Sequence, residues 1–92
     1  MPKRTLKIKV SAVSNVDRYW IKIDDKEVAH TGKAEGQVTV STGSHRLVYW
    51  AIGTPGGKLT IEISKGGDQI IKKTPRIPAD GDVANAPRFD VS

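Results

Sequence analysis

The stretch HRLVYWAI, residues 45–52, decides the fold of this chain. Successive residues of a β-strand point to opposite faces of the sheet, so alternate residues share a face. Both faces of this stretch are apolar, with Leu47, Tyr49 and Ala51 on one and Val48, Trp50 and Ile52 on the other. Such a strand is typical of the middle of a sheet or of a site that is covered on both sides.

Shorter stretches on either side alternate apolar and polar residues, which indicates strands with one wet face. The alternation is found at residues 6–12, 19–23, 38–40, 59–64 and 89–91, and residues 28–30 and 70–71 mark short strands that follow hairpin turns. No stretch of about ten residues has the period of an amphipathic helix. We therefore predict an all-β chain of about seven short strands.

Turn-forming residues separate several of these stretches. Asp24 and Asp25 suit a tight hairpin after the strand that ends at Ile23, and KGGD, residues 65–68, suits a second hairpin. Gly43 can adopt the positive φ that a chain reversal needs. The two hairpin signals predict that the strands on either side of each hairpin pair with each other.

Two further stretches are expected to interrupt the strands: SNVD, residues 14–17, as a turn, and GTPGG, residues 53–57, as a loop. GTPGG precedes Lys58 and has some likeness to a phosphate-binding loop. A P-loop needs a glycine where Ile52 stands and a hydroxyl where Leu59 stands. We therefore expect no phosphate site there.

Turn signals at this spacing predict a single antiparallel β-sandwich, immunoglobulin-like in a loose sense, with a small β-barrel as the alternative. The 92 residues form one domain, residues 1–92. Residues 75–92 carry three prolines, which exclude a central strand and predict an extended C-terminal segment. Phe89 and Val91 would add a last edge strand to the sheet.

The formal net charge is +5, which favours polyanionic partners such as nucleic acid, acidic glycans or anionic lipid. The basic residues are spread along the chain, so solvated strand faces and lysine-protected edges explain them better than a polyanion-binding site does. There is no cysteine, which excludes disulfides and thiolate zinc sites.

Candidate metal ligands are few. Asp80, Asp82 and Asn85 in DGDVAN have some likeness to a calcium loop, but the closing glutamate is missing and Asx turns explain the same residues. His30 and His45 lie in separate segments without a third ligand at a recognisable spacing. We expect no metal and no cofactor.

Catalytic groups are equally sparse. Ser41 and Ser44 lie in a turn and lack the strand-to-helix elbow of a nucleophile. Asp24 and Asp25 are adjacent carboxylates, but a hairpin turn accounts for them better than an acid and base pair does. We expect that the protein is not an enzyme.

The dipeptide Tyr-Trp occurs twice, at Tyr19-Trp20 and Tyr49-Trp50. Neighbours in a strand point to opposite faces, so each pair sends one ring into the core and one outward. If the tyrosines share the core face, both tryptophans point outward.

Trp20 then lies on a wet face between Arg18 and Lys22. Exposed aromatic rings beside cations suit stacking on a sugar or base, or an interface hot spot. The candidate binding residues are therefore Trp20, Arg18, Lys22 and Trp50. The alternative is that a loop or the proline-containing segment covers Trp20.

The first residues, MPKRTLKIKVSAVS, lack the apolar run of a signal peptide because Lys7 and Lys9 interrupt it. No stretch approaches the roughly 20 apolar residues that span a membrane as a helix. If the chain is complete, we expect it to be cytoplasmic.

The stretch VTVSTGSHRLVYWAIG, residues 38–53, resembles the central part of PEGA-type modules, and the preceding IKIDDKEVAHTG resembles their hairpin. The family's Pro-Glu-Gly-Ala signature is represented here by Ser41-Thr42-Gly43-Ser44, which keeps the glycine. The resemblance implies a small β-sandwich used as a surface or interaction module, usually outside the cytoplasm.

Together these features predict a non-catalytic binding or assembly module that recognises a protein or glycan partner through a basic, aromatic strand face. The alternative is an OB-like barrel that uses the same rings and cations to bind nucleic acid. The oligomeric state stays open, although the lysine-poor strand at residues 38–40 could pair with a second copy across a twofold axis.

Overall fold

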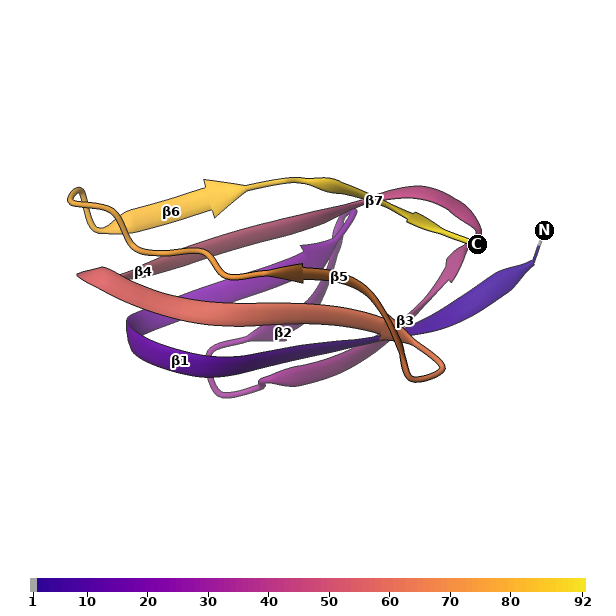
Figure 1. Cartoon of the computed structure of the whole chain (residues 1–92), viewed down its shortest axis with the longest axis horizontal. Helices are drawn as coiled ribbons and strands as arrows, with labels where there is room; N and C mark the ends of the chain where they lie inside the picture. The colour runs from indigo at the N-terminus through magenta and orange to yellow at the C-terminus, as the bar shows by residue number, and fades with distance from the viewer. Residues whose placement is uncertain (1) are drawn as a thin grey trace.

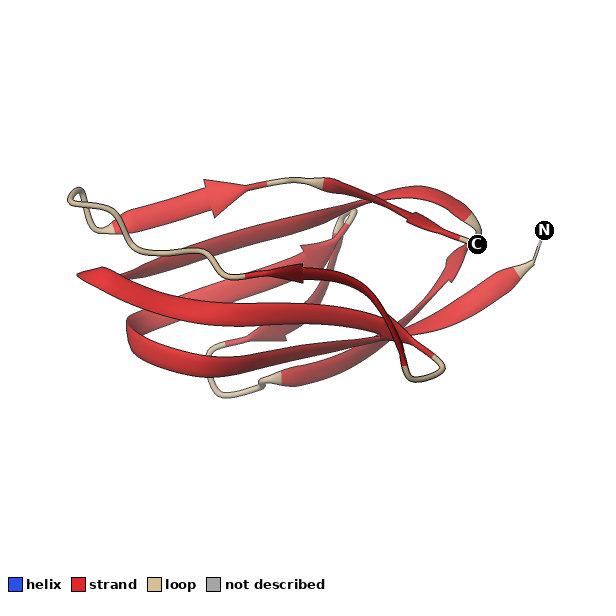
Figure 2. Ribbon diagram, viewed as in Figure 1, coloured by secondary structure: helices blue, strands red, loops and turns tan. Residues whose placement is uncertain are grey.

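The computed structural model of the protein describes residues 2–92, which form one antiparallel sheet and include no helix (Figures 1 and 2). The sheet has seven strands: β1 (Lys3–Ile23), β2 (Lys26–His30), β3 (Glu35–Ser41), β4 (Gly43–Lys65), β5 (Asp68–Lys73), β6 (Asp82–Asn85) and β7 (Arg88–Val91). The all-β prediction is confirmed. Within residues 2–92 the sheet is not closed into a barrel, so the small-barrel alternative is wrong.

Two of the strands are far longer than the sequence pattern predicted. β1 has 21 residues and β4 has 23, and each contains two of the predicted short strands. The expected turn at residues 14–17 and the expected loop at residues 53–57 are both wrong, because the strands continue through them. Figure 1 shows both long strands folding back at the same end of the molecule.

The fold-back of β1 follows from irregular pairing with β4. The register shifts three times between Ser11 and Arg18, and Ala12 and Asn15 have φ angles of 52° and 56°. Extra residues and left-handed conformations bend a strand and increase its twist. The polar stretch that predicted a turn therefore does redirect the chain, but without ending the strand.

Glycines allow β4 to bend across β1 at the same place. The backbone of Gly53 lies against the Asn15 carbonyl and Val16, and that of Gly57 lies against the same carbonyl. A side chain at either position would collide with β1. The glycine-rich stretch therefore permits close approach of two backbones, which is a packing role.

Folding over gives the sheet two halves that face each other across the core (Figure 1). One half has the order β3, first half of β1, second half of β4, β5. The other has the order β2, second half of β1, first half of β4, β6. The fully buried large side chains come from both halves: Leu6, Ile8, Ile21, Ile23, Leu47, Leu59, Ile61 and Ile63.

Residues 45–52 form a central strand, as predicted. β1 pairs with them on one side, while β6 and the start of β7 pair with them on the other. Leu47, Tyr49 and Ala51 are buried in the core, and the opposite face carries Trp50. The hairpins that join β1 to β2 and β4 to β5 are also confirmed.

The C-terminal segment covers the bend of β4. Ile77 is buried, donates from its amide to the Gly57 carbonyl oxygen (2.7 Å) and accepts from the Gly56 amide (2.9 Å). Beyond it, β7 forms the predicted last edge strand with Phe89 buried. β6 was not predicted, because Asp82–Asn85 has only one large apolar residue and pairs through its backbone.

A histidine clamp holds the other end of the molecule together. His45, at the start of β4, donates from Nδ1 to Asp24 Oδ2 and from Nε2 to the Ser41 carbonyl oxygen, each over 2.7 Å. The Arg46 amide also donates to Asp24 Oδ1 (3.0 Å). Both ring nitrogens face acceptors, so the geometry calls for a protonated imidazolium.

The pKa values of the pair are shifted in the matching directions. The hydrogen bond to Asp24, followed by the one to Ser41, raises the pKa of His45 above 6.5. Burial alone would raise the pKa of Asp24, but hydrogen bonds from His45 and from the Arg46 amide hold it below 3.8. Charged His45 therefore stabilises the fold.

We expect stability to decrease as the pH rises. The contribution of His45 is complete below pH 6.5 and is lost as the pH rises through its raised pKa, whereas that of Asp24 is lost only in acid. Urea titration should give a free energy of unfolding about 1 kcal/mol lower at about pH 8.5 than at about pH 5.5. The value is small because the Asp24 carboxylate is half exposed.

Two variants identify the titrating group. His45→Gln should flatten the decline between these pH values, whereas His30→Gln, which leaves the clamp intact, should keep it. An undiminished decline in His45→Gln would assign the pH dependence to another residue.

Candidate functional site

The two Tyr-Trp dipeptides lie side by side in the sheet. Tyr19 and Tyr49 are 6% and 7% exposed and belong to the core, where burial raises the pKa of the Tyr19 phenol. Trp20 lies directly opposite Trp50 on the outer face, with ring centroids 4.5 Å apart and planes inclined by 17°. The prediction that the tyrosines point inward and the tryptophans outward is confirmed.

The stacked rings are neither core nor fully exposed. Trp50 is 40% exposed, and Trp20 is half-buried. No covering loop is needed to explain this burial, since each ring shields one face of the other. Cross-strand aromatic pairs of this kind contribute about 0.5 to 1.5 kcal/mol beyond their buried area.

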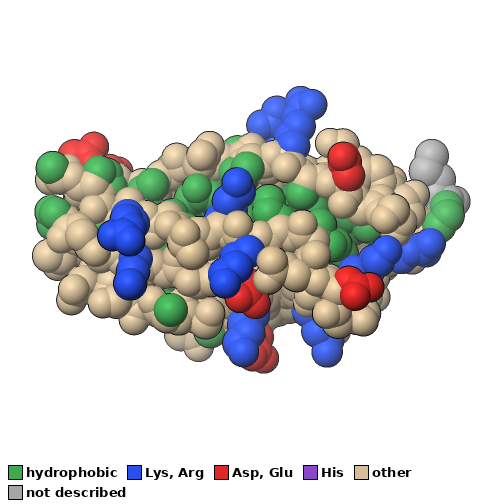
Figure 3. All heavy atoms as spheres, viewed as in Figure 1, with side chains coloured by type: hydrophobic (Ala, Val, Ile, Leu, Met, Phe, Trp, Pro, Cys, Tyr) green, Lys and Arg blue, Asp and Glu red, His purple; other side chains and the backbone are tan. Residues whose placement is uncertain are grey.

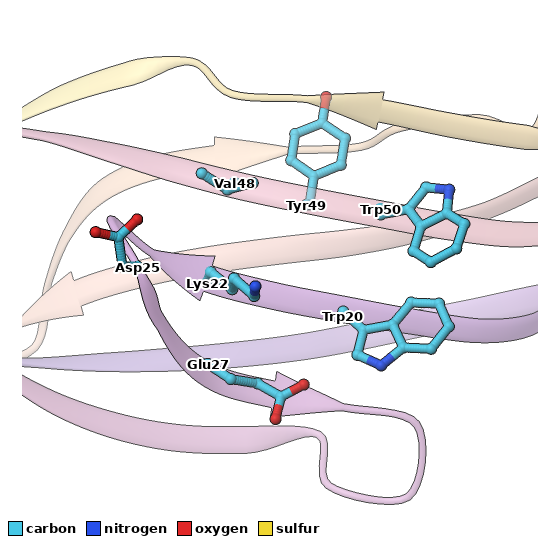
Figure 4. A pocket seen from close by; sticks show the side chains of 7 residues that line it. All are labelled: Trp20, Lys22, Asp25, Glu27, Val48, Tyr49 and Trp50. Atoms are coloured by element: carbon cyan, nitrogen blue, oxygen red, sulfur yellow. The ribbon is translucent and has the colours of Figure 1, made fainter.

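An open depression of about 510 Å³ lies beside the tryptophan pair (Figure 4). Its lining residues come from β1, β2, β4 and the β1–β2 turn: Trp20, Lys22, Asp25, Glu27, Val48, Tyr49 and Trp50. Figure 4 shows the two indoles next to each other at one end and Asp25 at the other. The term "tryptophan face" is used below for the outer surface that the other six residues form, since the Tyr49 side chain points into the core.

The structure brings three of the four predicted binding residues together. Trp20, Lys22 and Trp50 line the depression, whereas Arg18 lies on the same strand opposite Ile52 and outside the lining. The face is also less basic than expected.

Two carboxylates near Lys22 were missed by sequence reasoning. Asp25 belongs to the hairpin turn, and Glu27 lies opposite Lys22 in β2. The predicted hairpin could have indicated that these carboxylates lie near Trp20, because it returns the chain alongside the strand that bears Trp20. A bulge between Ile21 and Lys22 shifts the pairing, and this shift could not be read from alternation.

The other half of the sheet carries a row of alternating charge on its outer face. Lys9 lies opposite Glu35 on one side and Glu62 on the other, and Glu62 lies opposite Lys72 at 3.9 Å between Oε1 and Nζ. A depression of about 520 Å³ in this face is lined by both signs of charge. Figure 3 likewise shows basic side chains spread over the visible face, with acidic ones among them.

The described residues, 2–92, contain no cluster of three or more His, Asp or Glu side chains that could hold a metal ion. Asp82 and Asn85 of the calcium-like stretch are the ends of β6, and Asn85 Oδ1 accepts from the Ala86 amide (2.8 Å). His30 donates to the Thr31 carbonyl oxygen and His45 belongs to the clamp, so they do not form a pair.

Asp24, His45 and Ser41 occur together but not in the geometry of a hydrolase triad. His45 Nε2 contacts the backbone oxygen of Ser41, which accepts a hydrogen bond and carries no proton. A general base needs a free ring lone pair aimed at a hydroxyl. The arrangement suits a structural clamp.

No family model, no curated protein and no solved structure matches this chain. In addition, no helix in the described part of the chain, residues 2–92, is long and apolar enough to cross a membrane.

Proposed function

We propose that the protein is a non-catalytic binding or assembly module, and that the tryptophan face recognises a protein or glycan partner. The observation that carries the proposal is the stacked Trp20–Trp50 pair, which leaves Trp50 40% exposed beside an open depression. Tryptophan is among the residues that contribute most to binding when it sits at the centre of an interface.

The surroundings of the pair support this use. Both rings are held by paired strands and by each other, so little conformational entropy is lost when a partner orders them. Lys22, Asp25 and Glu27 supply one donor group and two acceptor groups around the apolar surface. An apolar centre with a polar rim is the usual composition of a protein or sugar contact.

The mixed charge favours such a partner over nucleic acid. A phosphate backbone is bound by clustered cations, whereas the depression holds two carboxylates and one ammonium group. The salt dependence of binding separates the two kinds of partner: nucleic-acid affinity falls steeply with added salt, while affinity for a protein or a neutral glycan changes little.

We further propose that the folded-over sheet acts as a β-sandwich scaffold, immunoglobulin-like in a loose sense. The support is the core that lies between its two halves. The resemblance of residues 38–53 to PEGA-type modules points to the same use, a surface or interaction module, and this stretch includes Trp50.

The test uses Trp20→Ala against the partner found by screening glycan and protein panels. Removing the ring should weaken binding by about 2 kcal/mol, roughly thirtyfold in the dissociation constant. It should lower the free energy of unfolding by only about 1 to 2 kcal/mol, because the ring is half-buried. Titration calorimetry and urea unfolding measure the two effects separately.

Val13→Ala is the matched control. Val13 is 44% exposed at the bend of β1 and lies outside the tryptophan face. Its replacement should leave affinity unchanged. Equal affinities of the parent and Trp20→Ala would remove the tryptophan face from the proposal.

A further inference from the structure

The outer edge of β3 offers hydrogen-bonding groups that β1 does not use. Val10 donates to the Ala34 carbonyl oxygen (2.7 Å) and Thr42 donates to that of Pro2 (3.2 Å), at the two ends of the β1–β3 ladder. In an antiparallel pair only alternate residues bond to the partner strand. The backbone N–H and C=O groups of the even-numbered residues of β3 therefore point toward β1. Those of Glu35, Gln37 and Thr39 point outward.

The stretch of unpaired backbone groups on the outer edge of β3 is bounded at both ends. Before Glu35, the Lys33 amide donates to the His30 carbonyl oxygen and the His30 amide donates to the Lys33 carbonyl oxygen. Beyond Thr39, the Ser41 carbonyl oxygen accepts from His45. The open edge therefore runs from Glu35 to Thr39, and Gln37 is its midpoint.

β3 also lacks the usual protection of an edge strand. Its pairing with β1 has no bulge, and its seven residues include no proline, lysine or arginine. The other edge strands of residues 2–92 have such protection. β5 carries Lys72 and Lys73, β2 pairs across a bulge, and β6 and β7 have only four residues each.

We propose that a second copy of this chain pairs with β3 across a twofold axis at Gln37, extending the sheet edge to edge. Antiparallel pairing about this point places Glu35 opposite Thr39 of the second copy and Gln37 opposite its equivalent. Every outward N–H and C=O group between Glu35 and Thr39 then has a partner. This inference does not rest on the tryptophan face, because β3 lies in the other half of the sheet.

Side chains are compatible with this register on both faces. On the core side, Val38 would lie opposite Gly36 of the second copy, which has no side chain and is covered by the Val28 backbone of its own chain. On the outer side, the two Gln37 amides can bond to each other, and Glu35 meets an uncharged threonine. No like charges face each other, so the edge is self-complementary.

Sedimentation velocity provides the first test. The protein should form dimers that dissociate on dilution between about 500 and about 5 μM. Gln37→Pro removes an outward donor without removing a bond to β1, and should raise the dimer dissociation constant at least about tenfold. A parent that sediments as a monomer throughout, or an unchanged dissociation constant in Gln37→Pro, would overturn the proposal.

Cross-linking tests the register even if Gln37→Pro fails to fold. The chain has no cysteine, so Gln37→Cys introduces the only thiol, and the twofold axis brings two copies of it within disulfide range. Lys7→Cys is the control, because Lys7 lies opposite Gln37 on the same face but one strand inward. Mild oxidation should cross-link Gln37→Cys much faster, and equal rates would contradict this register.

Discussion

Replacing Gly53 by alanine should lower the free energy of unfolding by about 3 kcal/mol, measured by urea titration. An added Cβ would collide with the Asn15 carbonyl and would lie 2.8 Å from the Val16 Cα. Both contacts are with backbone, which cannot move aside as a flexible side chain can. To accept alanine, β4 would have to withdraw from β1 at the bend where the sheet folds over.

Thr54→Ala is the control for this change. Thr54 is the next residue of the same bend and is exposed, so its replacement should alter stability by less than about 0.5 kcal/mol. Gly57→Ala should resemble Gly53→Ala, because its Cβ would lie 2.5 Å from the same Asn15 oxygen. If both glycine variants matched the parent, the two strands could not cross as closely as the fold requires.

Replacing Ile61 by alanine should cost about 3 to 5 kcal/mol of unfolding free energy. Ile61 is completely buried in the second half of β4, between Val10 of β1 and Lys73 of β5. Its neighbours belong to paired strands and cannot collapse into the space that the lost carbons leave. A domain of this size has a total stability of about 5 to 14 kcal/mol, so much of it would be lost.

Ile70→Ala is the control, because it makes the same chemical change at a less buried position. Ile70 is half-buried in β5, so Ile70→Ala should cost about 1 kcal/mol. Chemical denaturation of both variants at one pH measures the difference. Similar losses at the two positions would mean that the second half of β4 is not the interior of the fold.

The outward position of the tryptophans could be predicted, but their stacking could not. Alternation along each strand places Trp20 and Trp50 on the face opposite to Tyr19 and Tyr49, since successive side chains point to opposite faces. Stacking needs Trp20 to lie opposite Trp50, and this register depends on how β1 pairs with β4 across their bends. Local sequence contains no information about that pairing.

The bends of β1 and β4 were also predicted only in part from the sequence. Polar residues 14–17 and glycines in residues 53–57 marked places where the chain changes direction, and it does so at both. Turn-forming residues indicate a change of direction but not whether the backbone keeps its hydrogen bonds through it. Here the bend of β1 pairs with the bend of β4, so both strands continue through positions where the sequence alone predicted a turn and a loop.

The sequence by itself determined the all-β class, most residues of the core and the hairpins next to β2 and β5, because alternation and turn chemistry act over a few residues. It did not indicate that Ile77 is buried in the core. The tertiary structure decided that two predicted short strands join into β1 and two others into β4. It also decided that Asp25 and Glu27 lie beside Trp20, and that His45 reaches Asp24. These contacts join residues far apart in the chain. They exist because two long strands fold over together, which depends on pairing and packing between distant segments.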